Sequence, residues 1–74
     1  MVYEVKAPIT GSVWMPCVAA GQTVRAGETV VIMECMKMEF PVIAEKGGIV
    51  VFVCESAASV EEGEVVARIE EIAP

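Results

Sequence analysis

The chain of 74 residues is predicted to fold as one all-β domain, and its length, apolar content and strand pattern support this. A chain this short supports one hydrophobic core, since it buries only about 60% of its unfolded surface. An apolar fraction of 55% favours a packed core over disorder. Short runs rich in valine and isoleucine recur between glycine-containing turns, and no long run keeps a helical apolar period. Residues 1–74 are therefore expected to form a single domain.

Six main strands are expected between the turns: Tyr3–Ala7, Ser12–Val18, Thr29–Glu34, Met38–Ala44, Gly48–Cys54 and Glu64–Glu70. Shorter extended pieces are expected around Val24 and Val60. The glycines between them fit turns or bulges, where positive φ or a close backbone approach is needed: Gly11, Gly21, Gly27, Gly48 and Gly63.

A weak internal repeat divides the chain into two similar halves. Gly11–Val13 resembles Gly48–Val50 at an offset of 37 residues, and Val24–Val30 resembles Val60–Val66 at an offset of 36. One residue has therefore been lost in the second half, between the two matched segments. Halves related by an approximate two-fold axis can cover each other's apolar faces, which predicts a flattened barrel or sandwich.

The composition excludes several classes of function. Eleven acidic residues against five Lys and Arg give a formal charge of −6, which opposes binding to nucleic acid because phosphates require cationic side chains. The sequence contains no His and no Asp, so it lacks the usual general base, the commonest metal ligand and any Ser-His-Asp arrangement. We therefore expect a protein that does not catalyse a reaction alone.

The cysteines and the hydropathy pattern indicate the compartment. Cys17, Cys35 and Cys54 form an odd set without C-x-x-C spacing, so neither a disulfide framework nor a zinc site is expected. No apolar run is long enough to span a bilayer, and the N-terminal segment lacks the pattern of a signal peptide. We expect a soluble cytoplasmic protein with reduced thiols and without direct membrane insertion.

The seam between the halves is the candidate functional site. Two predicted strands lie so close on either side of it that they should pair as a hairpin, with Met36 and Lys37 in the turn. Two-residue hairpin turns strongly favour Asn-Gly or Asp-Gly, so a local rule is broken here, as at many functional sites. We expect the amine of Lys37 to stand in solvent at the tip. Acylation of a lysine amine needs an activated carboxyl donor, so we expect a modifying enzyme.

Three segments carry a resemblance to a known family. Glu34–Glu39, which reads Glu-Cys-Met-Lys-Met-Glu, resembles the biotin-attachment signature Glu-Ala-Met-Lys-Met of the biotinyl/lipoyl carrier family. Ala7–Val13 resembles the family's opening Ala-Pro-x-x-Gly-x-Val, and Gly21–Glu28 resembles its turn segment Gly-Asp-x-Val-x-x-Gly-Gln. Nearly the whole chain is covered, and the likeness is closest to the biotin carboxyl carrier domains of biotin-dependent carboxylases.

The resemblance implies a fold and a site. The expected fold is an all-β flattened barrel-sandwich of two four-stranded antiparallel sheets with a pseudo-two-fold repeat. Lys37, at the hairpin tip, is the implied site of covalent biotin attachment. Glu34, Cys35, Met36 and Met38 form the rest of the attachment motif. Neither a catalytic residue nor a metal ligand is implied.

The resemblance also implies partners. Biotin protein ligase, an ATP-dependent enzyme, would biotinylate the lysine. A biotin carboxylase would load the biotin from bicarbonate, and a carboxyltransferase would pass the carboxyl group from carboxybiotin to an acyl-CoA or a 2-oxo acid. Such a carrier serves a carboxylase, transcarboxylase or decarboxylase complex; in sodium-pumping members the carboxyl group comes from a donor and a membrane partner releases it.

The sequence departs from the family pattern in three places. Cys35 replaces the usual alanine before Met-Lys-Met, and its small size should preserve modification. Ala57-Ala58 replaces a Gly-Asp turn, which makes a left-handed conformation costlier there. No long Ala-Pro linker precedes Ala7, so the chain is either a free-standing subunit or a domain excised from a longer polypeptide.

Three alternative functions remain open. A lipoyl carrier domain would share the fold and lysine position but usually has Asp-Lys-Ala, so Met36 and Met38 favour biotin. An unmodified barrel-sandwich adaptor of a transport assembly would leave Lys37 incidental. A thiol redox or metal-binding module is disfavoured by the cysteine spacing and the absence of His.

Three expectations concern side chains outside the turn itself. Cys17 and Cys54 occupy corresponding places in the repeat and are expected to be buried core thiols. Glu34 and Glu39 bracket the tip and are expected to be solvated. Some of the surface formed by the apolar side chains on the strands is expected to be exposed: Trp14, Met15 and Phe52.

Overall fold

The computed structural model describes residues 1–71, and within them every regular element is a strand. The eight strands, in chain order, are β1 (Val2–Lys6), β2 (Gly11–Pro16), β3 (Thr23–Val24), β4 (Thr29–Cys35), β5 (Met38–Ile43), β6 (Gly48–Val53), β7 (Ser59–Val60) and β8 (Val65–Glu71). The main strands lie within two residues of the ranges that the sequence predicts. Residues 72–74 of the expected domain lie outside the described residues.

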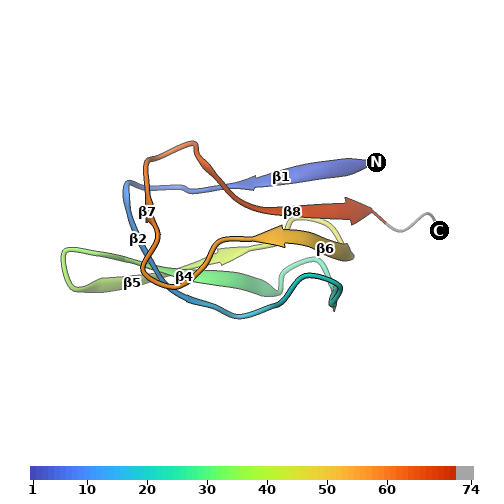
Figure 1. Cartoon of the computed structure of the whole chain (residues 1–74), viewed down its shortest axis with the longest axis horizontal. Coiled ribbons are helices and arrows are strands. Elements are labelled where there is room, and N and C mark those ends of the chain that lie inside the picture. The colour runs from blue at the N-terminus through green and yellow to red at the C-terminus, as the bar shows by residue number, and fades with distance from the viewer. Residues whose placement is uncertain (72–74) are drawn as a thin grey trace.

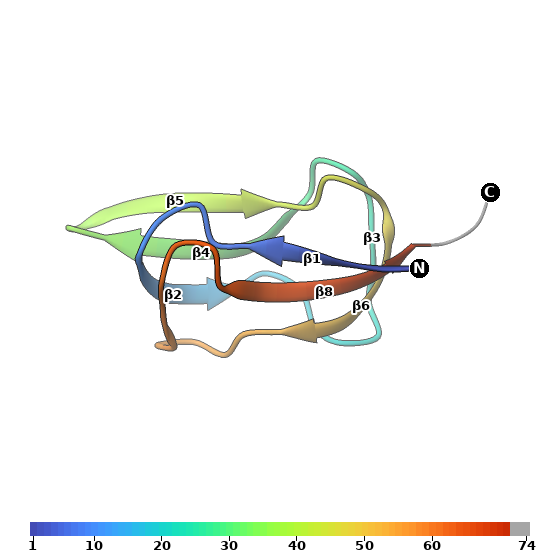
Figure 2. The same cartoon turned by 90° about the horizontal axis from the view of Figure 1, so that it is seen from above.

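The strands form two four-stranded sheets, with orders β1-β8-β6-β3 and β5-β4-β2-β7, and every pairing is antiparallel. Replacing each strand by its counterpart in the other half converts one order into the other, so a pseudo-two-fold axis exchanges the sheets. The flattened barrel-sandwich expected from the sequence is confirmed. Figures 1 and 2 show an elongated body, with principal extents of 40 × 19 × 18 Å.

The repeat extends to individual backbone hydrogen bonds. The amide of Cys17 donates to Val30 at 2.9 Å, and the amide of Cys54 donates to Val66 at 2.9 Å. The turn that follows closes with Gln22 N to Ala19 O at 3.0 Å in one half and with Ala58 N to Glu55 O at 3.3 Å in the other. The residue missing from the second half therefore lies directly after Cys54.

The core between the sheets is built mainly from valines of both halves. Its fully buried large side chains are Met33, Ile69, Val13, Val24, Val30, Val31, Val50 and Val66. Burying each such side chain contributes about 1.5–3 kcal/mol, and no polar side chain among residues 1–71 shares this core. The two sheets therefore hold together by apolar contact that each half supplies to the other.

A β-bulge in each half explains why one prediction was wrong. The β2–β4 register shifts between Val13 and Met15, and the β6–β8 register shifts between Val50 and Phe52. An extra residue reverses the alternation of faces beyond a bulge. Cys17 is therefore exposed and Cys54 only half-buried, so they are not the buried core thiols that the sequence suggested.

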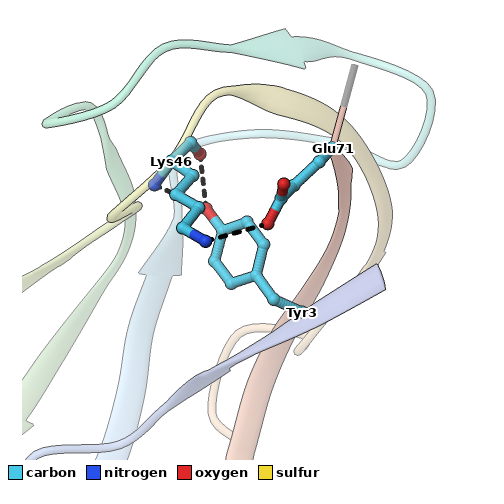
Figure 3. A network of polar contacts seen from close by, with 3 residues as sticks. All are labelled: Tyr3, Lys46 and Glu71. Carbon is cyan, nitrogen blue, oxygen red and sulfur yellow. Dashed lines mark hydrogen bonds and ion pairs between the residues drawn. The ribbon is translucent and has the colours of Figure 1, made fainter. Parts of the chain in front are cut away.

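A small polar network joins the chain ends to the β5–β6 connection (Figure 3). The Tyr3 hydroxyl donates to the Lys46 carbonyl oxygen and accepts from the Lys46 amide at 3.0 Å. The Lys46 amine lies 3.2 Å from the Glu71 carboxylate. β1 and β8 are thus tied to the rest of the body at the start of β1 and the end of β8.

The Cys54 thiol is partly shielded from solvent. Cys54 donates a weak hydrogen bond to the Val65 carbonyl at 3.6 Å. Burial, and then the nearby carboxylate of Glu64, raise the pKa of the Cys54 thiol above its ordinary value, because both disfavour the thiolate.

We expect alkylation of Cys54 by iodoacetamide to lag in the folded chain, because a raised pKa leaves less of the reactive thiolate at a given pH. Its rate should rise at higher pH in the folded chain than in the same chain in urea. Peptide mass spectrometry across a pH series measures both profiles. Coincident profiles would contradict the assigned environment.

A second prediction concerns a turn that the two halves build from different residues. Gly21 has φ 92° and donates to Val50 O at 2.6 Å, whereas Ala57 has φ 68° and donates to Val13 O at 2.7 Å. Ala57→Gly should raise the free energy of unfolding by about 0.5–1 kcal/mol, because it removes the left-handed penalty of an alanine. Gly21→Ala should lower it.

Denaturant unfolding of both variants measures the pair. No atom lies within 4 Å of a methyl group built on Gly21, so the loss in Gly21→Ala would be conformational rather than steric. A loss of stability in Ala57→Gly would contradict this account of the turn.

Candidate functional site

The connection between β4 and β5 is the tight hairpin that the sequence predicts. The two strands pair from Thr29↔Ile43 to Cys35↔Met38, which leaves Met36 and Lys37 alone in the turn. Their φ values are 51° and 65°. Positive φ at both central residues is the type I′ geometry, whose twist matches that of paired strands. The strand pairing therefore dictates the backbone of the turn.

The turn residues themselves are costly choices. Neither Met36 nor Lys37 is a residue that adopts positive φ readily, and each costs roughly 1–2 kcal/mol relative to glycine. The long β4–β5 ladder overrides this preference. Because strain of this kind persists where a side chain has a use, the structure agrees with the sequence in marking this turn as a site.

The tip stands at one extreme of the molecule. In Figures 1 and 2 the β4–β5 turn occupies the end of the long axis opposite to the N-terminus and to the end of β8. Lys37 is exposed, and among residues 1–71 it takes part in no ion pair. Met36 and Met38 are 89% and 61% exposed, so neither thioether fills the core. The tip thus offers one free amine between two accessible apolar side chains.

The other motif residues lie at the base of the tip. Glu34 and Glu39 are directly opposite each other in the β4–β5 register, and both are exposed, as expected. Carboxylates so placed repel one another, and water screens the repulsion. Cys35 is half-buried and its sulfur is free. The structure therefore brings all five motif residues together, with Met36 and Lys37 in the turn and Glu34, Cys35 and Met38 on the strands beside it.

The apolar side chains expected at the surface are indeed exposed, but they lie on β2 and β6 rather than at the turn. Trp14 is the extra residue of the β2 bulge and is 47% exposed, beside Met15 at 44%. Phe52 is 39% exposed, and the Arg68 guanidinium lies 5.3 Å from its ring centroid. Arg68 thus covers part of the apolar surface of β6 with a cation–π contact.

Sequence reasoning missed the neighbours of the hairpin. Ser12 pairs with Glu34, and Gly11 lies against the backbone of Glu34 and the Cβ of Cys35. The sequence predicted that Gly11 lies in a turn or bulge. Only the pairing of β2 with β4 brings Gly11 next to the hairpin.

A groove of about 410 Å³ opens between the edge strands β1 and β5. Its lining is drawn from Tyr3–Lys6, Pro8 and Pro41–Ile43, with Glu45, and includes no residue of the tip. Within residues 1–71 no three His, Cys, Asp or Glu side chains converge on a possible metal site. No helix in the described part of the chain is long and apolar enough to cross a membrane.

The sequence of the chain is similar to a known family and to several known proteins. The family model described as "Biotin-requiring enzyme" matches residues 3–69. The "Biotinylated protein TB7.3 homolog" of Mycobacterium leprae is 39% identical over 66 residues, which are 89% of this chain and 86% of that protein. The "Biotin-dependent acyl-coenzyme A carboxylase alpha3 subunit" of the same organism is 46% identical over 66 residues, 88% of this chain but 11% of that protein.

A solved structure is also similar to this fold. The crystal structure of Kluyveromyces lactis urea carboxylase superposes with a TM-score of 0.88 at 37% identity, over 95% of this chain and 6% of that protein. The chain thus corresponds to a small part of some relatives and to nearly the whole of another.

Proposed function

The chain belongs to the biotin-requiring family, and on that premise we propose that residues 1–74 form a single biotinyl carrier domain, with Lys37 as the attachment site. The observation that carries the proposal is the position of Lys37, which is exposed in a two-residue turn at the end of the molecule opposite to the N-terminus. An amine so placed can enter the active site of another enzyme while the body stays outside.

The residues of the tip fit covalent biotin. The nitrogen of a primary amine bonds to the activated carboxyl carbon of biotin, the activating group leaves with its bonding electrons, and the nitrogen gives up one proton and keeps the other as the amide N–H. A biotin protein ligase supplies the activated carboxyl group and takes up the proton. Met36 and Met38 give the ligase an apolar contact on either side of the amine.

The proposed role is that of a biotin carboxyl carrier. Bound biotin accepts and gives up a carboxyl group, and the domain brings it to a biotin carboxylase and then to a carboxyltransferase. Tethering raises the local concentration of the cofactor at each enzyme, so the carrier needs rigidity and reach rather than catalytic side chains. We place the carrier in the cytoplasm, where its three free cysteines remain reduced, and propose no direct membrane insertion.

The relatives favour biotin over lipoate at this site. Both carriers share the fold, so the discrimination depends on the thioethers beside Lys37 and on relatives named for biotin. The intact mass of the chain purified from cells distinguishes a biotinyl group, a lipoyl group and no modification. The third outcome, in cells that contain an active ligase, would favour the unmodified adaptor.

Lys37→Arg should fold normally and take up no label from biotin, ATP and a biotin protein ligase, because arginine keeps the charge but offers no primary amine. Lys6→Arg and Lys46→Arg are the matched controls and should be labelled as fast as the parent chain. Streptavidin blotting after a fixed time measures all four. Label on Lys37→Arg would refute the attachment site.

A further inference from the structure

The hairpin extends beyond the sheet that supports it. The β2–β4 register reaches the tip as far as Ser12↔Glu34, whereas the β4–β5 register continues to Cys35↔Met38. β2 therefore supports the hairpin only as far as Gly11, its first residue. The hairpin segment from Cys35 to Met38 projects beyond the body of the domain.

At this place there is no room for a side chain. A methyl group built on Gly11 would lie 2.5 Å from the Glu34 carbonyl oxygen and 3.3 Å from the Cys35 Cβ. The first distance is shorter than real contacts allow, and the obstructing atom is backbone, which cannot rotate aside as a side chain can. One of the two strands would have to move.

The supporting strand is held more firmly than the hairpin end. Val13 is 1% exposed in the core, and Gly11 itself pairs with Val60 of β7. The hydroxyl of Thr10 accepts a hydrogen bond from the Glu62 amide at 2.9 Å, which fixes the connection before β2. Glu34 is itself paired with Ser12 and Glu39 and follows the buried Met33, but beyond it Cys35 pairs with Met38 alone. A shift of the Glu34 backbone would therefore be passed on to the hairpin end.

We infer that Gly11 is a positioning residue for Lys37. Because Gly11 has no side chain, β2 can approach the Glu34 backbone closely, and this approach sets the angle at which the turn projects. That angle determines where the amine lies relative to the domain surface that a ligase contacts. The inference rests on the proposed function, since it concerns delivery of that amine to a modifying enzyme.

The pseudo-symmetry supplies a matched control. Gly48 is the counterpart of Gly11, and a methyl group there would lie 2.2 Å from the Glu70 carbonyl oxygen and 2.7 Å from Ile69 Cγ2. Its contact strand is β8, at the end of the molecule opposite to the β4–β5 turn. Gly48→Ala therefore introduces at least as severe a clash, remote from Lys37.

The test compares ligase kinetics of the 74-residue chain, Gly11→Ala and Gly48→Ala, at a temperature where circular dichroism shows each protein folded. Gly11→Ala should lower kcat for biotinylation at saturating carrier by about tenfold or more, because a displacement near 1 Å is enough to spoil approach of the amine. Gly48→Ala should keep the parent kcat. Loss of stability alone lowers the folded fraction and changes apparent KM, not kcat.

The outcomes separate the two proposals. Failure of the parent chain to accept biotin would contradict the carrier function itself. A parent chain that is labelled, with Gly11→Ala at the parent kcat or with both variants equally slow, would overturn the positioning role alone. Should Gly11→Ala fail to fold, it is remade with Ala57→Gly; failure there too would assign Gly11 to folding and overturn the inference.

Discussion

The antiparallel pairing of β4 with β5 is the constraint on which the site depends. It runs without interruption from Val31 to Cys35, and its right-handed twist selects a type I′ turn at its end. Met36 and Lys37 occupy positive φ because the ladder leaves them no alternative. The backbone pairing alone thus places Lys37 in the turn at the end of the hairpin.

The two-fold repeat relates this hairpin to a second pair of strands. Its counterpart in the other sheet is the β1–β8 pair, whose register begins at Val2↔Glu70. Tyr3, Lys46 and Glu71 tie that pair to the β5–β6 connection (Figure 3), at the end of the long axis opposite to the β4–β5 turn.

Much of this could be predicted from the sequence, because the relevant signals are local. The strand pattern and the repeat predicted the fold, and the spacing of two apolar runs predicted the hairpin around Lys37. The bulge after Val13 could not be predicted, because it depends on how β2 and β4 pair, and it turned Cys17 outward. The contact of Gly11 with Glu34 is equally non-local. What sequence alone missed are therefore contacts between strands distant along the chain.

Tandem mass spectrometry of the chain, co-expressed with a biotin protein ligase and digested, tests the central claim most directly. The account predicts biotin on the peptide that contains Lys37, bonded to that amine, with Lys6 and Lys46 unmodified. Biotin on either of those two lysines instead, or a lipoyl group on Lys37, would contradict it.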